Sequence, residues 1–195
     1  NDPKKKKNMK IKDVALNYLY VSHPIFVKLY RNVCGFTGTI GSQNDKDLFK
    51  QQYGLVTDKI PRNKPNRRIQ LPIILCKNLT ERNQKILEEV FSFNVLNIPV
   101  LVVLRDLREI GKIKALLASK RIYNVNVFDG INDKLNPEEL AGLDGAVSLG
   151  TNFCGRGTDI QFKGKPLHVI VSYYSRNERV MQQVYGRTAR QGKEG

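Results

Sequence analysis

Two short motifs in the last quarter of the chain combine arginine and glycine in patterns that suit a phosphorylated ligand. The first is GRGTDI at residues 155–160. Arg156 offers a planar fork of donors, Gly157 permits close approach of the backbone, and Asp159 can accept hydrogen bonds from hydroxyls such as those of a ribose. Taken alone, this motif is explained equally well by a tight surface turn closed by an Arg156–Asp159 ion pair.

The second motif is QVYGRTARQG at residues 183–192. Its arginines, Arg187 and Arg190, are three positions apart, so on a helical turn they would project from the same side and could reach one phosphate. Phosphoryl transfer needs positive charge aimed at the developing negative oxygens, and arginine supplies it with fixed geometry. The alternative is a pair of solvated arginines at a helix start, which the presence of both motifs makes the weaker interpretation.

Other kinds of site are excluded by the residues that would have to form them. The three cysteines (34, 76 and 154) are far apart and the only histidines are His23 and His168, which excludes a CxxC zinc site and a disulfide scaffold and favours a reducing compartment. The chain also has no GxxxxGK[ST] phosphate loop. Asp106 follows an apolar run as a magnesium ligand would, but without that loop we expect it to cap the next helix. No metal ligands are therefore predicted.

Composition and charge indicate a basic globular protein. The 195 residues include 41% apolar and 26% charged residues, and 33 Lys plus Arg against 18 Asp plus Glu give 33 − 18 = +15. Six lysines lie in residues 1–12, which we interpret as a solvated flexible tail. The longest apolar run, residues 98–104, is far shorter than the roughly 20 residues that span a bilayer, so no transmembrane segment is expected. The charge could attract nucleic acid, anionic lipid or nucleotide phosphates.

From about residue 70 onward, strand-like and helix-like segments alternate, which predicts an α/β fold with a doubly wound, mostly parallel sheet and helices on both faces. Ligands bind such sheets beyond the carboxyl ends of the strands, where the loops at Thr39, Gly155 and Gly186 would fall. The expected strands are 70–76, 99–104, 124–128, 146–149 and 167–171, and the expected helices are 78–93, 106–120, 137–143 and 176–185.

The N-terminal third has a less regular pattern. Residues 14–30 are apolar and aromatic but interrupted by Pro24, which predicts two short helical pieces. A strand at 33–36 should end at the turn Thr37-Gly38-Thr39. A helix at 45–53 and a strand at 55–60 follow, and then a basic, proline-containing linker from residue 61.

These motifs together resemble the SecA family of superfamily 2 motor ATPases, the motors of preprotein translocation. GRGTDI and the later GRxxRQG resemble motifs V and VI of that family's second RecA-like nucleotide-binding fold. Further matches run in order along the chain. They are FVKLY (26–30) with CGFTGT (34–39), YGL (53–55) with IPRNKP (60–65), and IPVLV (98–102).

The resemblance implies roles for single residues. Arg187 and Arg190 would be catalytic arginine fingers, while Gly157 and Asp159 would contact nucleotide. Two more nucleotide-site residues, Arg156 and Gln183, would support the interface between two folds, and Thr37, Gly38 and Thr39 would couple those folds.

It also implies an organisation and partners. Residues 13–60 would close a first nucleotide-binding fold and residues 61–195 would form the second, of P-loop NTPase helicase type. ATP would bind between them, with Mg²⁺ held by the first fold, so the chain alone should be inactive. Partners would be that first fold, unfolded preprotein and a membrane channel. The resemblance places such a chain in the cytoplasm or an organellar stroma-like compartment, peripherally associated with a membrane.

Two alternatives remain. GRTAR is typical of DEAD-box RNA helicases, so the chain could be the second RecA-like domain of such an enzyme, with RNA as partner; TGT at 37–39 and RQG at 190–192 favour the motor family. A noncatalytic relic that binds an acidic partner through its basic surface is the third interpretation.

Overall fold

The described residues contain a four-stranded parallel sheet with helices packed on it. The computed structural model describes residues 20–128, 140–152, 160 and 164–195. In the described chain the strands are β1 (Val100–Leu104), β2 (Val125–Phe128), β3 (Val147–Thr151) and β4 (His168–Val171), in the order β2-β3-β1-β4, all parallel. Each overlaps a strand expected from the sequence.

The apolar run at residues 98–104 contains the central strand β1. All five of its residues are buried, because neighbouring strands cover its edges and helices cover both faces. Alternate side chains serve opposite sides: Val102 packs into one core cluster and Leu101 into the other.

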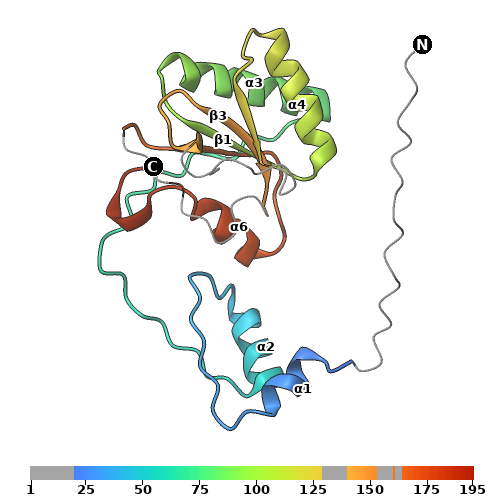
Figure 1. Ribbon diagram of the computed structural model, residues 1–195, viewed down its shortest axis with the longest axis vertical. Helices are drawn as coiled ribbons and strands as arrows, with labels where there is room; N and C mark the ends of the chain where they lie inside the picture. The colour runs from blue at the N-terminus through green and yellow to red at the C-terminus, as the bar shows by residue number, and fades with distance from the viewer. Residues whose placement is uncertain (1–19, 129–139, 153–159, 161–163) are drawn as a thin grey trace, which may run out of the picture.

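The helices lie on both faces of the sheet, which confirms the predicted doubly wound α/β architecture. Helices α3 (Leu79–Val95) and α4 (Leu107–Ser119) pack on one face. Helix α6 (Glu178–Tyr185) lies on the opposite face, where its Val184 enters the second cluster (Figure 1).

Side-chain caps start these helices where the sequence indicated. Asn78 Oδ1 accepts a hydrogen bond from Glu81 N at 2.9 Å at the start of α3. Asp106 Oδ1 accepts from Glu109 N at 3.0 Å at the start of α4, so Asp106 is a helix cap, as predicted.

The described N-terminal residues form a small helical unit on the α6 side of the sheet (Figure 1). Helices α1 (His23–Lys28) and α2 (Gln43–Tyr53) contact each other, and an extended segment connects them to the sheet (Figure 1). Pro24 lies in the first turn of α1, where its missing N–H costs no hydrogen bond, so it starts a helix rather than interrupting one. Most of the other helical piece expected before it falls outside the described residues. Neither helix has a buried residue.

Three expected strands, at 33–36, 55–60 and 70–76, are wrong. In the described structure these residues form no strand, and four apolar side chains of the third segment, together with that of Ile69 just before it, are more than half exposed. Apolar composition predicts strand tendency, but a strand also needs a neighbour for its backbone N–H and C=O groups. The exposed side chains are Ile69, Leu71, Ile73, Ile74 and Leu75. Three of the seven residues of the helix expected at 137–143 lie outside the described part; of the other four, residues 140 and 141 are helical and residues 142 and 143 are not.

Candidate nucleotide site

In the sequence, the first motif lies shortly after strand β3. Strand β3 ends at Thr151, but residues 153–159 lie outside the described part, and with them Arg156, Gly157 and Asp159. Ile160, the last residue of the motif, is buried in the second core cluster.

The second motif forms a loop after α6, which we call the arginine loop (residues 186–192). Asn177 caps α6 by accepting from Val180 N at 3.3 Å, and the helix ends at Tyr185, with Gly186 as its C-cap. The expectation that Arg187 and Arg190 share a regular helical turn is wrong. Ala189 between them is left-handed, with φ 54° and ψ 37°, and Arg190 begins a separate 3₁₀ turn, Arg190–Gly192.

The two arginines therefore have different environments. Arg187 is only 8% exposed, so its guanidinium is largely withdrawn from water. Arg190 is half-buried, and its Nε donates to the Gly186 carbonyl at 2.7 Å, which fixes the direction of its side chain. A fixed guanidinium meets the requirement that charge be in place before phosphoryl transfer.

The loop itself is attached to the sheet by a buried hydrogen bond. Thr188 Oγ1 donates to the Leu167 carbonyl at 2.7 Å, immediately before β4. Gly195 packs so closely on Thr188 that a Cβ at this position would clash with Thr188 Oγ1. The arginine loop is therefore anchored at its middle.

A third contact joins two of the predicted groups. Gln183 Nε2 on α6 donates to Thr39 Oγ1 at 3.4 Å. Thr39 belongs to a turn in which its N–H donates to Thr37 Oγ1 at 3.2 Å, around Gly38. The structure thus brings Gln183 together with the Thr37-Gly38-Thr39 segment.

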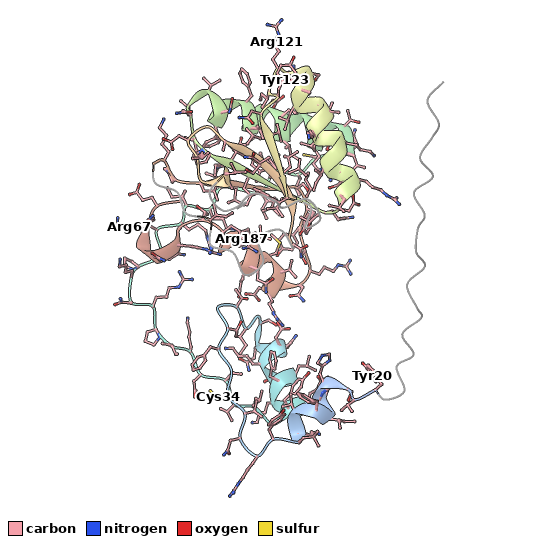
Figure 2. The ribbon with its side chains drawn as sticks, in the orientation of Figure 1. Tyr20, Cys34, Arg67, Arg121, Tyr123 and Arg187 are labelled. Carbon is pink, nitrogen blue, oxygen red and sulfur yellow. The ribbon has the colours of Figure 1, made fainter. Side chains whose placement is uncertain are left out.

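Sequence reasoning missed the part played by the linker, residues 61–68. Ile69 N, just after the linker, donates to the Gly195 carbonyl at 2.7 Å, and the Arg68 guanidinium lies 5.2 Å from the centre of the Tyr185 ring. Figure 2 shows Arg67 of the linker and Arg187 at the same level of the molecule, below the sheet. The basic run was visible in the sequence, but nothing local indicated which surface it would meet.

An open groove of about 800 Å³ separates the linker from the arginine loop. Arg190 lines this groove and Arg187 does not, although the sequence predicted the same role for both arginines. The lining residues are Arg62, Asn63, Lys64, Pro65, Asn66, Arg68, Gly186, Thr188, Ala189, Arg190, Gln191 and Gly192.

A partly buried histidine, His168, lies at the amino end of β4. The His168 ring stacks on Phe93 with centroids 3.7 Å apart, and its Nε2 lies 3.1 Å from Glu89 Oε1. Burial lowers the pKa of His168, and the charge and hydrogen bond of Glu89 oppose that shift without cancelling it. This pair stabilises the packing between α3 and β4.

Comparison with known proteins assigns the chain to a protein family. The family model described as the SecA P-loop domain matches residues 65–172, from the linker through all four strands. This chain belongs to the SecA family. The matched residues include no GxxxxGK[ST] loop, and the SecA match ends before the arginine loop.

Individual SecA relatives match over nearly the whole chain. The protein translocase subunit SecA of Elusimicrobium minutum is 29% identical over 206 residues, which cover 97% of this chain and 23% of the relative. Those of Thermosipho africanus and Campylobacter fetus are 28% and 27% identical, each over 97% of this chain and 23% of the relative. The chain thus spans about a quarter of the length of these SecA proteins.

Proposed function

We propose that this chain supplies the second RecA-like nucleotide-binding domain of a SecA-type, ATP-driven motor for protein translocation. The observation that carries the proposal is the anchored arginine loop on a SecA-family α/β sheet. Arg187 and Arg190 act there as arginine fingers on an ATP site shared with a first nucleotide-binding fold. Thr188 and the Gly186 carbonyl support the fixed geometry that such a role needs.

The remaining site residues have supporting roles in this proposal. Gly157 and Asp159 contact the nucleotide, and Arg156 and Gln183 stabilise the interface between the folds. The segment Thr37 to Thr39 couples the two folds, and the Gln183–Thr39 hydrogen bond supports that assignment.

ATP is the proposed cofactor, and the donors of the arginine loop fit it chemically, because guanidinium groups bind phosphate oxygens. Mg²⁺ belongs to the first fold in this proposal. Among the described residues, no group of three or more His, Cys, Asp or Glu is placed to hold a metal ion.

We further propose a boundary between folds near residue 60. Residues 1–12 form a basic tail, 13–60 close the first fold, and 61–195 form the second. The absence of buried residues in α1 and α2 supports this division, because helices without a core of their own need another surface to cover them.

The proposed partners are the first fold, unfolded preprotein and a membrane channel, and the proposed location is a cytoplasmic or stroma-like compartment at a membrane surface. Within the described part of the chain, no helix has both the length and the apolar character to cross a bilayer. A DEAD-box-type RNA helicase is the second candidate, because GRTAR and the charge of +15 suit RNA.

The test is ATP hydrolysis by this chain combined with the first fold of the same protein. One arm contains unfolded, signal-bearing polypeptide and the other single-stranded RNA. Stimulation by polypeptide alone, lost in Arg190→Ala and retained in the control Arg108→Ala on α4, supports the motor. Stimulation by RNA alone identifies a helicase, and no response in either arm favours a noncatalytic relic.

A further inference from the structure

The groove between the linker and the arginine loop has a strongly one-sided charge. Arg62, Lys64, Arg68 and Arg190 bring four positive charges to its lining, which contains no acidic residue. Among the residues that the structure describes, no carboxylate lies within ion-pair distance of Arg62, Lys64 or Arg68. Several like charges around one hollow produce a potential that concentrates anions there.

The groove is also built from defined contacts. The two segments are joined by the Ile69–Gly195 hydrogen bond, by a backbone bridge between Arg67 and Glu194, and by the Arg68–Tyr185 contact. Gly192, with φ 77°, approaches Lys64 so closely that a Cβ there would meet the Lys64 side chain at 3.0 Å. These contacts hold the cationic linker against the arginine loop although the two are far apart in sequence.

We infer that this groove binds the polyphosphate tail of a nucleotide, with Arg62, Lys64 and Arg68 of the linker as phosphate ligands beside Arg190. The inference rests on the proposed function and extends it, because it assigns phosphate binding to linker residues for which the family resemblance implies no role. Guanidinium and ammonium groups form charge-assisted hydrogen bonds with phosphate oxygens. The volume of about 800 Å³ lies in the range of small-molecule sites.

The lining argues against a single-stranded nucleic acid as the ligand. Proteins that bind single strands stack successive bases on aromatic side chains, and the groove lining includes no aromatic residue. Tyr185, which is outside this lining, already contacts the Arg68 guanidinium through its ring. Phosphate is therefore the recognised chemistry, and an oligonucleotide belongs in the test as the competing outcome.

The experiment is calorimetric titration of the 195-residue chain at about 0.15 M salt, where charges beyond ~8 Å are largely screened. The probes are inorganic tripolyphosphate, ATP and a single-stranded oligoribonucleotide. The test variant is Arg62→Gln with Lys64→Gln and Arg68→Gln. Its matched control removes three exposed charges from α4 through Arg108→Gln, Lys112→Gln and Lys114→Gln.

We expect the test variant to weaken tripolyphosphate binding by about tenfold or more and the control by less than about twofold. Absence of tripolyphosphate binding by the unmodified chain, equal weakening in both variants, or tighter binding of the oligoribonucleotide would overturn the inference. Circular dichroism shows whether the triple variant, which loses the Arg68–Tyr185 contact, still folds. If it does not, the double variant Arg62→Gln with Lys64→Gln replaces it. We expect this double variant to weaken tripolyphosphate binding by about threefold.

This result is independent of the hydrolysis experiment. Calorimetry needs neither the first fold nor turnover, so failure of tripolyphosphate binding leaves the arginine-finger proposal standing. Conversely, hydrolysis that does not depend on Arg190 leaves the groove as a phosphate site without a role in turnover.

Discussion

Gln183 Nε2 on α6 donates a hydrogen bond to Thr39 Oγ1 across 144 positions of sequence, at 3.4 Å. It joins the helix that presents the arginine loop to the small N-terminal helical unit. The bond is partly exposed and near the long end of the range, so it stabilises the contact only modestly. The bond is important because it links the two segments directly, so that a displacement of residues 37–39 is transmitted to α6.

We predict that Gln183→Ala loosens the turn at residues 37–39. With one partner removed, Thr39 loses its link to α6, and amide hydrogen exchange in peptides covering residues 37–42 should accelerate by about two- to fivefold. Gln182→Ala is the control, because Gln182 bonds to Glu178 on the same helix instead. Equal acceleration in both variants would show that general loosening of α6, and not this bond, is responsible.

The anchor of the arginine loop provides a prediction about stability. Thr188→Val keeps the shape of the side chain but removes the buried donor to the Leu167 carbonyl, so the free energy of unfolding should fall by about 1–2 kcal/mol. Urea unfolding of the chain measures it. Thr80→Val, at an exposed position of α3, should change the free energy of unfolding by less than about 0.5 kcal/mol. A comparable loss in both variants would contradict the role of the anchor.

His168 predicts how stability depends on pH. Its folded pKa lies below the ordinary value of 6.5, so the unfolded chain binds the proton more readily. Stability contributed by neutral His168 is therefore full above the unfolded pKa and declines as pH falls through 6.5 toward the folded pKa. Urea midpoints between pH 7.5 and 5.5 should show this decline.

Substitution of each histidine in turn tests the assignment. His168→Gln should flatten the profile, whereas His23→Gln, at an exposed position of α1, should leave it unchanged. A profile that stays steep in His168→Gln would assign the pH dependence to other groups.

We also predict negligible ATP hydrolysis by the 195-residue chain alone. The sequence contains no phosphate loop, and the arginines of one fold stabilise charge without activating water. A phosphate-release assay with and without the first fold measures this. Robust turnover by the isolated chain, abolished by Arg190→Ala, would refute it.

The parts of the fold that could be predicted from the sequence are those with a strong burial signal. β1 is recognisable because both of its faces are covered, and Asn78 and Asp106 mark helix starts through local capping chemistry. The segments 55–60 and 70–76 also contain several apolar residues but have no strand partner among the described residues, and pairing is a tertiary event that composition does not encode.

The candidate site divides in the same way. The positions of Arg187 and Arg190 could be found from spacing, but their separate environments depend on the left-handed Ala189, an unusual conformation for a residue with a side chain. The groove could not be found at all, because it requires residues 62–68 to meet the arginine loop. Roles for Arg156, Gly157 and Asp159 remain predictions.

The exposed apolar side chains between Ile69 and Leu75 have a practical consequence for handling the protein. An extended apolar segment without a strand partner is a template for pairing with the same segment of another molecule, so the isolated chain should aggregate as its concentration rises. Pro72 interrupts the segment and removes one N–H donor, which limits such pairing to the residues after it. Co-expression with a partner that covers these side chains should raise the yield of unaggregated protein.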